Sequence, residues 1–193
     1  MNIDFSLIRS APKSRNDSFE ALAVQLFRKT CRVPTKSTFI SLRGDGGDGG
    51  VEAYFRSPDG AVFGVQAKYF FQLASAELTQ IDSSLKAALS NHPTLTEYWI
   101  YIPFDLTGRV AAGKRGKSQA ERFEEWKSKV ESEASAKGKS LSIVLCTAAV
   151  ICNQLLEIDP YGGMRRYWFD DTLLTAAQIQ QCLDDAIAFA GPR

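Results

Sequence analysis

The sequence predicts an α/β sandwich with a mixed central sheet, and three observations lead to this fold class. Segments with apolar residues at helical spacing alternate along the chain with short segments rich in β-branched and aromatic residues. The turn sequence Ser57-Pro-Asp-Gly60 separates two strand-like segments and predicts a hairpin, whereas helical segments separate the later strands. The 193 residues, of which 45% are hydrophobic and 23% charged, suit one globular domain of ordinary size.

The spacing of apolar and turn residues predicts each element in order. After an N-terminal arm of 15 residues, a first helix is expected to begin at Asp17, with Glu20 as its capping-box partner, and to end at Val33-Pro34. Strands are expected at residues 39–42, 51–55, 61–68, 98–102, 141–146 and 166–169. Further helices are expected at residues 75–91, 118–137, 148–157 and 175–189, the last of them capped by Thr175. Residues 16–70 would then hold the catalytic motifs, and residues 71–193 the remainder of the sandwich.

Charge and cysteine content narrow the functional classes. A net charge of +1 and a pI of about 7.6 lack the basic excess of compact, tight nucleic-acid binders, but they suit an enzyme that contacts DNA briefly. The four cysteines form no Cys-x-x-Cys pair, and the single histidine, His92, precedes a proline and is expected to be structural, which argues against a zinc site. Because the chain has no signal peptide and no run of roughly 20 apolar residues, we expect a soluble, cytoplasmic protein with buried, reduced thiols and no membrane partner.

The segment that carries chemistry runs from the glycine-rich stretch at residues 44–50 to Lys68. Strand alternation places Gln66 and Lys68 on one face and the apolar Val65 on the other. The hairpin is expected to bring Glu52 beside them, which joins a carboxylate, an amide oxygen and an ammonium group. A hard divalent cation such as Mg²⁺ takes oxygen ligands and lowers the pKa of a bound water, while a lysine stabilises developing negative charge. This set of groups predicts phosphodiester hydrolysis.

The sequence Gly-Gly-Val-Glu52 followed by Gln-Ala-Lys68 resembles the PD-(D/E)XK nuclease superfamily, and within it the Mrr-like branch. The resemblance covers about residues 17–68 and implies a restriction-endonuclease-like α/β/α sandwich with Mg²⁺ or Mn²⁺ as its cofactor. It implies that Glu52 and Gln66 bind the metal, that Lys68 is catalytic, and that Glu20 assists from the first helix.

Two departures from the usual pattern of that superfamily affect the ligand set. Glu52 stands where aspartate is commoner, so Asp48 becomes a further candidate for the metal and the catalytic centre. Gln66 replaces a carboxylate with a neutral amide, which predicts modest metal affinity. We expect the backbone carbonyl of Ala67 to supply another ligand oxygen.

Three further stretches resemble the N-terminal nuclease domains of bacterial anti-phage proteins, which precede a STAND-type NTPase (Avs-type) or a nucleotide-sensing module. These stretches are Gln66-Ala-Lys-Tyr-Phe70, His92-Pro-Thr-Leu95 and Ile102-Pro-Phe-Asp-Leu-Thr-Gly108. The resemblance implies a nuclease effector that is activated by assembly, self-associates as a dimer or tetramer, and is followed by an NTPase or sensor domain. Double-stranded DNA, cut with little sequence specificity, is the expected substrate, with RNA as an open alternative.

Each candidate also has a purely structural interpretation. Residues 44–50 would form a flexible loop, and Glu52, Gln66 and Lys68 would lie on a solvated hairpin face. Glu20 is already explained as a capping partner, and Asp48 as a turn residue.

Outside the central motif, the interpretations also stay open. A glycine-rich loop carries Arg109, Lys114, Arg115 and Lys117. These residues either form a basic patch that contacts DNA phosphates and that Arg122 extends, or they are simply solvated. Tyr69 and Phe70 either line the DNA channel or pack in the core. The rival functions are a catalytically inactive nucleic-acid-binding module and an assembly module of a larger signalling protein.

Overall fold

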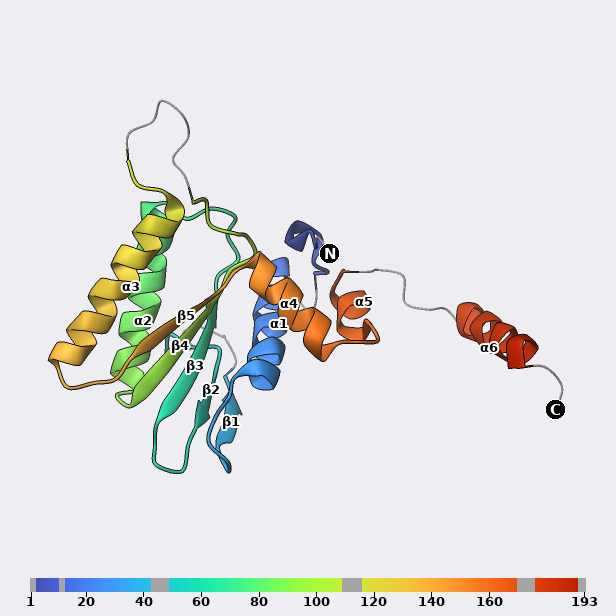
Figure 1. The fold of residues 1–193 in the computed structure, drawn as a ribbon, viewed down its shortest axis with the longest axis horizontal. Coiled ribbons are helices and arrows are strands. Elements are labelled where there is room, and N and C mark those ends of the chain that lie inside the picture. Colours follow the sequence, from blue (N-terminus) through green and yellow to red (C-terminus); the bar gives the residue numbers. More distant parts are fainter. Residues whose placement is uncertain (1–2, 11–12, 43–48, 109–115, 170–175, 191–193) are drawn as a thin grey trace.

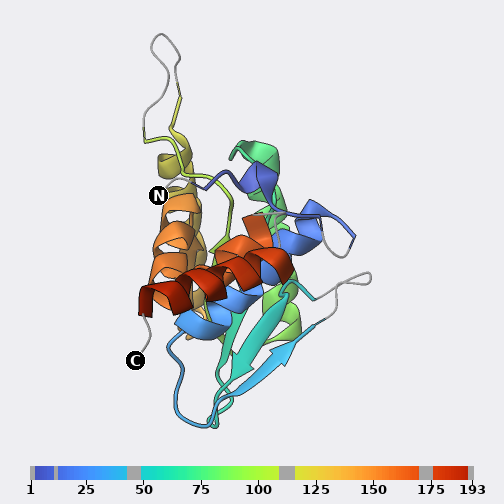
Figure 2. The same cartoon turned by 90° about the vertical axis from the view of Figure 1, so that its right-hand side faces the viewer.

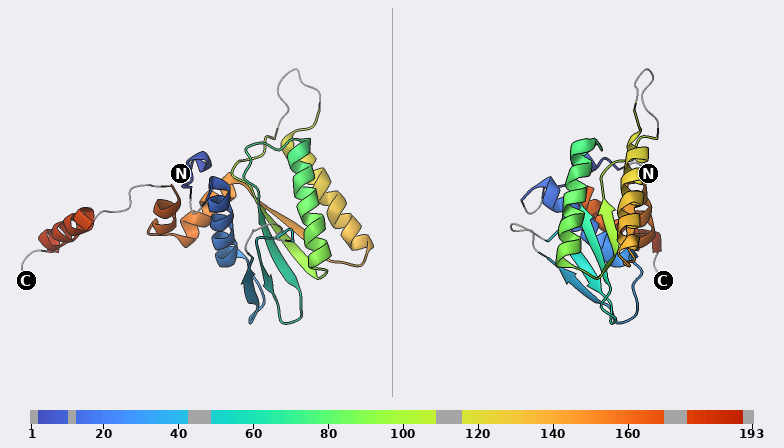
Figure 3. Two further views of the ribbon diagram at one scale, coloured as in Figure 1. Left: turned by 180° about the vertical axis from the view of Figure 1, so that it is seen from behind. Right: turned by 90° about the vertical axis from the view of Figure 1, so that its left-hand side faces the viewer.

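The computed structural model describes residues 3–10, 13–42, 49–108, 116–169 and 176–190. The sheet and the helices that pack on it form three layers (Figure 1). A five-stranded sheet lies between two helical layers. Helices α1 (Arg15–Thr30) and α4 (Ala148–Ile158) cover one face, and α2 (Ser75–Asn91) and α3 (Gln119–Ala136) cover the other. Figure 2 shows the α1 and α4 side, and the right panel of Figure 3 shows α2 and α3 in front of the sheet.

The sheet is mixed, as the sequence predicts. Its strand order is β1-β2-β3-β4-β5, where the strands are Thr38–Ser41, Ala53–Arg56, Val62–Ala67, Leu95–Tyr101 and Ser142–Cys146. Strands β1, β2 and β3 form an antiparallel meander, while β3, β4 and β5 run parallel. The parallel strands are joined by α2 and α3, because a parallel connection must cross over the sheet. The α/β class is therefore confirmed.

Two separate apolar clusters hold the layers together. The first joins α1 and α4 to the sheet through side chains such as Phe19, Val65 and Tyr101, all less than 1% exposed. The second joins α2 and α3 to the opposite face through side chains such as Leu85 and Tyr98. Both faces of β3 are therefore covered, and the alternative interpretation of a solvated hairpin face does not hold for this strand.

The first helix begins earlier than the sequence suggests. Its N-cap is Ser14, whose hydroxyl accepts a hydrogen bond from the Asp17 backbone N–H at 3.1 Å. Asp17 thus lies in the first turn, and the predicted capping box of Asp17 with Glu20 is wrong. The polar run around residues 14–17 offers several residues able to cap, and apolar periodicity alone does not choose among them. The Glu20 carboxylate instead accepts a hydrogen bond from the Asn16 amide at 2.6 Å.

The strand predicted at residues 166–169 is instead part of the helix α5 (Gly163–Phe169). The Asp159 carboxylate, just before this helix, accepts hydrogen bonds from the Arg165 backbone N–H at 3.0 Å and from its guanidinium group at 3.4 Å. Trp168 is buried, and its indole N–H donates to Gln25 on α1 at 3.1 Å. These contacts stabilise the short helix α5, whereas the aromatic residues alone favoured a strand. The last helix, α6 (Ala176–Ala190), lies beyond the sandwich, and its expected cap Thr175 is outside the described residues.

The N-terminal segment expected as an arm packs against the core. Phe5, in the 3-10 helix η1 (Phe5–Leu7), and Ile8 are both buried in the cluster beneath α1. The Arg9 backbone N–H donates to the Trp168 carbonyl at 2.8 Å.

The cysteines whose side chains the structure describes are buried, as the composition suggests. Cys31, Cys146 and Cys152 are buried and free. Burial raises the pKa of the Cys31 and Cys146 thiols to about 12. None of the helices in the described ranges has the length and hydrophobicity that a membrane span requires.

A glycine is required at position 50, because the chain passes close to α2 there, just before β2 begins. Its φ is +87°, and a Cβ atom at this position would overlap the Ser84 carbonyl oxygen and lie 2.5 Å from the Ala88 nitrogen. The Gly50 carbonyl accepts a hydrogen bond from the buried Tyr98 hydroxyl at 2.8 Å. This contact fixes the chain two residues before Glu52.

We expect Gly50→Ala to lower the free energy of unfolding by about 2–5 kcal/mol, which adds the cost of left-handed backbone to that of overpacking. Gly60→Ala is the matched control, because Gly60 has a φ of +88° but no atom within 4 Å of an added Cβ. The control should lose only about 1–2 kcal/mol. Urea denaturation of both variants measures the difference, and equal losses would show that the contact with α2 contributes nothing.

Candidate active site

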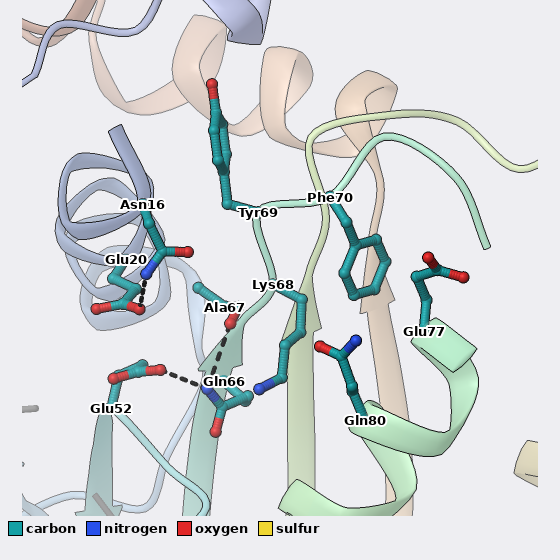
Figure 4. Close-up of a pocket in the computed structure, with 10 residues that line it drawn as sticks. All are labelled: Asn16, Glu20, Glu52, Gln66, Ala67, Lys68, Tyr69, Phe70, Glu77 and Gln80. Atoms are coloured by element: carbon teal, nitrogen blue, oxygen red, sulfur yellow. Dashed lines mark hydrogen bonds between the residues drawn. The ribbon is translucent and has the colours of Figure 1, made fainter. Parts of the chain in front are cut away.

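A polar cavity of about 310 Å³ opens at the carboxyl end of β3, between α1 and α2 (Figure 4). It brings together four of the five catalytic candidates expected from the sequence. The lining residues are Asn16, Glu20, Glu52, Gln66, Ala67, Lys68, Tyr69, Phe70, Glu77 and Gln80.

Glu52 and Gln66 form the floor of the cavity. Glu52 directly precedes β2, and its backbone N–H donates to the Val65 carbonyl at 2.7 Å, which sets Glu52 beside Gln66 in the register of the hairpin. Both side chains are almost fully buried, with 5% and 4% exposed. Buried polar groups of this kind cost free energy unless they are satisfied, so a solvated hairpin face is the wrong description for them.

The Gln66 amide bridges two oxygen atoms. Its Nε2 donates to Glu52 Oε1 and to the Ala67 carbonyl oxygen, the latter at 3.2 Å. The Gln66 Oε1 atom is buried without a hydrogen-bond partner. A half-turn of the amide about its terminal bond would exchange Nε2 and Oε1 and would direct three oxygens to one point.

This donor set fits a hard divalent cation. After that half-turn, the Gln66 Oε1 atom would lie beside the Glu52 carboxylate and the Ala67 carbonyl, and the three oxygens could bind one cation together. In the described part of the chain, no three His, Cys, Asp or Glu side chains gather as a metal site. The ligands here would therefore include an amide and a backbone carbonyl, as Mg²⁺ and Mn²⁺ accept.

Lys68 follows β3 directly and is half-buried in the wall of the cavity. Its backbone N–H donates to the Tyr101 carbonyl at 2.9 Å, which continues the parallel ladder one residue past the strand. In Figure 4 its side chain extends back toward the Gln66 end of the cavity. The strand alternation predicted from the sequence thus holds through Lys68.

Glu20 reaches the cavity from α1. Its carboxylate accepts a hydrogen bond from the Asn16 amide at 2.6 Å, one turn earlier on the same helix. Figure 4 shows Glu20 on the wall above Glu52. Glu20 therefore lines the cavity and does not act as a capping residue of α1.

Charge balance in the cavity favours a cation. Among the described lining residues, the carboxyl groups of Glu20, Glu52 and Glu77 stand against the one ammonium of Lys68, so these four groups carry a formal charge of −2 when all are ionised. Hydrogen bonds from its own backbone N–H and that of Ala74 hold the pKa of the Glu77 carboxyl below its usual value. A phosphodiester approaching these carboxylates would be repelled unless a cation were bound.

Four of the expected residues cannot be placed. Asp48, Arg109, Lys114 and Arg115 lie outside the described residues. Lys117, just before α3, is described and forms an exposed ion pair with Glu125. That pairing is compatible with either a solvated loop or a phosphate contact, because exposed ion pairs are weak.

Sequence reasoning missed several cavity residues. Asn16 and Gln80 are polar residues on helix surfaces, and their positions follow only from how α1 and α2 pack. Glu77 was detectable, since it lies three residues after the N-cap of α2 and its carboxylate accepts from the Ala74 backbone N–H at 2.9 Å. Tyr69 and Phe70 are half-buried, line the cavity and pack against the two core clusters.

Comparison with known proteins does not assign a family or a function to this chain. The chain matches no protein-family model, and no curated protein matches it. The function is therefore inferred from the chemistry of the cavity together with the motif resemblance described above.

Proposed function

We propose that this protein is a metal-dependent endonuclease that hydrolyses DNA phosphodiester bonds with little sequence specificity. The observation that carries the proposal is the convergence of the Glu52 carboxylate, the Gln66 amide and the Ala67 carbonyl, with Lys68 in the same cavity. Metal-dependent hydrolysis of a phosphodiester uses such a combination of oxygen ligands and a positive charge.

The fold supports membership of the PD-(D/E)XK nucleases, in the Mrr-like branch. The restriction-endonuclease-like α/β/α sandwich that we propose is compatible with an antiparallel meander followed by parallel strands and flanking helices. The motif residues lie at the end of β3, where the resemblance requires them to meet. Fold alone does not imply an activity, so the proposal depends on the cavity.

Each cavity residue has a chemical role in the proposal. Glu52, the Gln66 amide oxygen and the Ala67 carbonyl would hold Mg²⁺ or Mn²⁺, with Asp48 as a further candidate ligand. When bound, the metal lowers the pKa of a coordinated water and screens the phosphate charge. Lys68 stabilises the negative charge that develops on the phosphate oxygens. Glu20, held by Asn16, orients the attacking water through a hydrogen bond.

In the cell, we propose that the chain acts as the nuclease effector of a cytoplasmic anti-phage defence protein. Its near-neutral charge suits an effector whose DNA affinity arises on assembly, because several copies combine weak phosphate contacts. Cutting both strands with one active site per chain requires at least two copies. A following NTPase or sensor domain would control that assembly.

The test is cleavage of supercoiled plasmid by the purified protein at high concentration, with Mg²⁺ or Mn²⁺ and then with excess chelator. We expect nicked and linear products with either metal, no product in chelator, and recovery when metal is restored. Products that persist in chelator would contradict a metal-dependent mechanism. DNA binding without cleavage, in the isolated chain and in an assembled longer protein, would instead support an inactive binding module.

A further inference from the structure

The basic residues of this near-neutral chain are unevenly distributed. The sequence contains 23 lysines and arginines against 22 aspartates and glutamates, yet residues 21–44 contain five of the basic residues and none of the acidic ones. Four of these five, Arg28, Lys29, Arg32 and Lys36, lie in the part of the segment that the structure describes. One segment therefore concentrates a positive charge that the composition of the whole chain conceals.

These four residues form one exposed surface, which we call the basic surface. Arg28 and Lys29 lie in the last turn of α1, Arg32 follows the helix, and Lys36 lies two residues before β1. All four are exposed, and none of them forms an ion pair with another described residue. The Arg28 guanidinium lies over the Phe39 ring of β1, 4.9 Å from its centroid, so the carboxyl end of the helix lies beside the strand (Figure 3, left panel).

A purely structural role accounts for only part of the basic surface. Basic residues in the last turn stabilise a helix, because the backbone dipoles leave partial negative charge at its carboxyl end. Arg28 and Lys29 fit that role, whereas Arg32 and Lys36 lie outside the helix. Lys36 also has a φ of +67°, and it is the one residue other than glycine with a positive φ in the described ranges. Glycine or asparagine would adopt this conformation at lower cost, which favours a use for the lysine charge.

The chemistry of the basic surface suits the phosphates of a nucleic-acid backbone. The exposed lysines 86, 117 and 129 lie against carboxylates, whereas the basic surface has no acidic residue among its neighbours along the chain. Duplex DNA carries one negative charge about every 1.7 Å of its axis, and counterions are released when unpaired cations contact its phosphates. Glu20 in the cavity and Arg28 are separated along α1 by about 12 Å, which is the rise of about three to four base pairs.

We propose that the basic surface binds the phosphates of duplex DNA a few base pairs away from the phosphate to be cut. The inference rests on the proposed function for the identity of the polymer and for its location relative to the cavity. Contacts with phosphates position a duplex and carry no direct sequence information, which agrees with the low specificity proposed for cleavage.

The test measures the affinity of the whole chain for a fluorescent blunt DNA duplex by anisotropy, in chelator, over a range of salt concentrations. The triple variant Lys29→Gln, Arg32→Gln, Lys36→Gly removes three charges and leaves the contact between Arg28 and Phe39 in place. Glycine at position 36 also suits the positive φ there. Each lost phosphate contact should flatten the slope of log affinity against log salt by about 0.9, and three contacts by about 2.7. Between about 50 and 200 mM salt, the wild type should therefore lose about 40-fold more affinity than the variant.

The control is a second triple variant, Lys86→Gln, Lys129→Gln, Lys137→Gln, which makes the same change in charge on the face formed by α2 and α3. Lys86 and Lys129 form ion pairs on the surface of their helices, and Lys137 is the exposed C-cap of α3. The control should keep the wild-type slope, because it leaves the basic surface intact. Circular dichroism checks that both variants fold.

Four outcomes would overturn the inference. They are absence of duplex binding by the wild type at low salt, an unchanged slope in the first variant, an equal change in both variants, and tighter binding of the wild type to phosphatidylserine vesicles than to DNA. The third outcome would reflect net charge alone, and the fourth would assign the basic surface to a membrane. Failure of the nuclease proposal is distinguishable, because plasmid cleavage would then be absent while duplex binding that depends on the basic surface persists.

Discussion

Replacing Lys68 with methionine is expected to lower the rate of metal-dependent DNA cleavage by about 10²- to 10³-fold. The substitution keeps the length of the side chain and removes its charge from a cavity lined by three carboxyl groups. No other lysine or arginine is among the residues that line this cavity in the described part of the chain. The loss should appear in the rate at saturating DNA, because the charge is needed most as negative charge develops on the phosphate.

Lys86→Met is the matched control for Lys68→Met. Lys86 lies on α2, its side chain is 75% exposed, and its ion pair with Asp82 at 2.6 Å is a surface contact of little energetic weight. Both variants should unfold at nearly the same temperature as the wild type. Cleavage by Lys68→Met at the wild-type rate would remove the assignment of this cavity, and it would indicate a contaminating nuclease if Glu52 variants were also fully active.

Replacing Glu52 with glutamine is expected to abolish the response of the protein to Mg²⁺ and Mn²⁺. Replacing a residue that hydrogen-bonds a metal ligand typically lowers the affinity for the metal by about 10- to 100-fold. Loss of a charged ligand itself should lower it at least as much. Without metal, the variant should be as stable as the wild type, because it replaces a buried carboxylate with a neutral group of the same shape. The wild type should be stabilised by added metal, since a ligand that binds only the folded state raises the melting temperature.

Thermal unfolding over a range of Mn²⁺ concentrations measures this difference, alongside plasmid cleavage. Glu77→Gln is the control, because Glu77 also lines the cavity but its carboxylate caps the start of α2. It should keep most of the metal-dependent shift. Equal shifts in the wild type and Glu52→Gln would place the cation elsewhere, and loss of the shift only in Glu77→Gln would move the metal site to α2.

Local patterns predicted most elements, and the errors have identifiable causes. The helix expected at residues 75–91 is α2 without any change of bounds, because its apolar periodicity runs unbroken and His92-Pro93 follows it. The strand expected at residues 166–169 is a helix, because Asp159 and Gln25 supply hydrogen bonds that short aromatic runs do not reveal. The start of α1 was misjudged because Ser14, Asn16 and Asp17 are all residue types that favour caps.

The sequence by itself determined that the side chains of Glu52, Gln66 and Lys68 lie together at the end of β3. Strand alternation places Gln66 and Lys68 on the same face, and the tight turn at residues 57–60 sets Glu52 beside Gln66. These relations are local, since they depend only on the two-residue period of a strand and on the length of one turn. The candidate metal ligands were therefore predictable before any packing was known.

Only the tertiary structure decided what surrounds these groups. The packing of α1 over β3 brings Glu20 and Asn16 to the cavity, and the packing of α2 adds Glu77. Burial of Glu52 also depends on how helices distant in sequence cover the two faces of the sheet. No local period encodes such contacts, because the side chains that meet are separated by tens of residues and are placed by the close packing of whole layers.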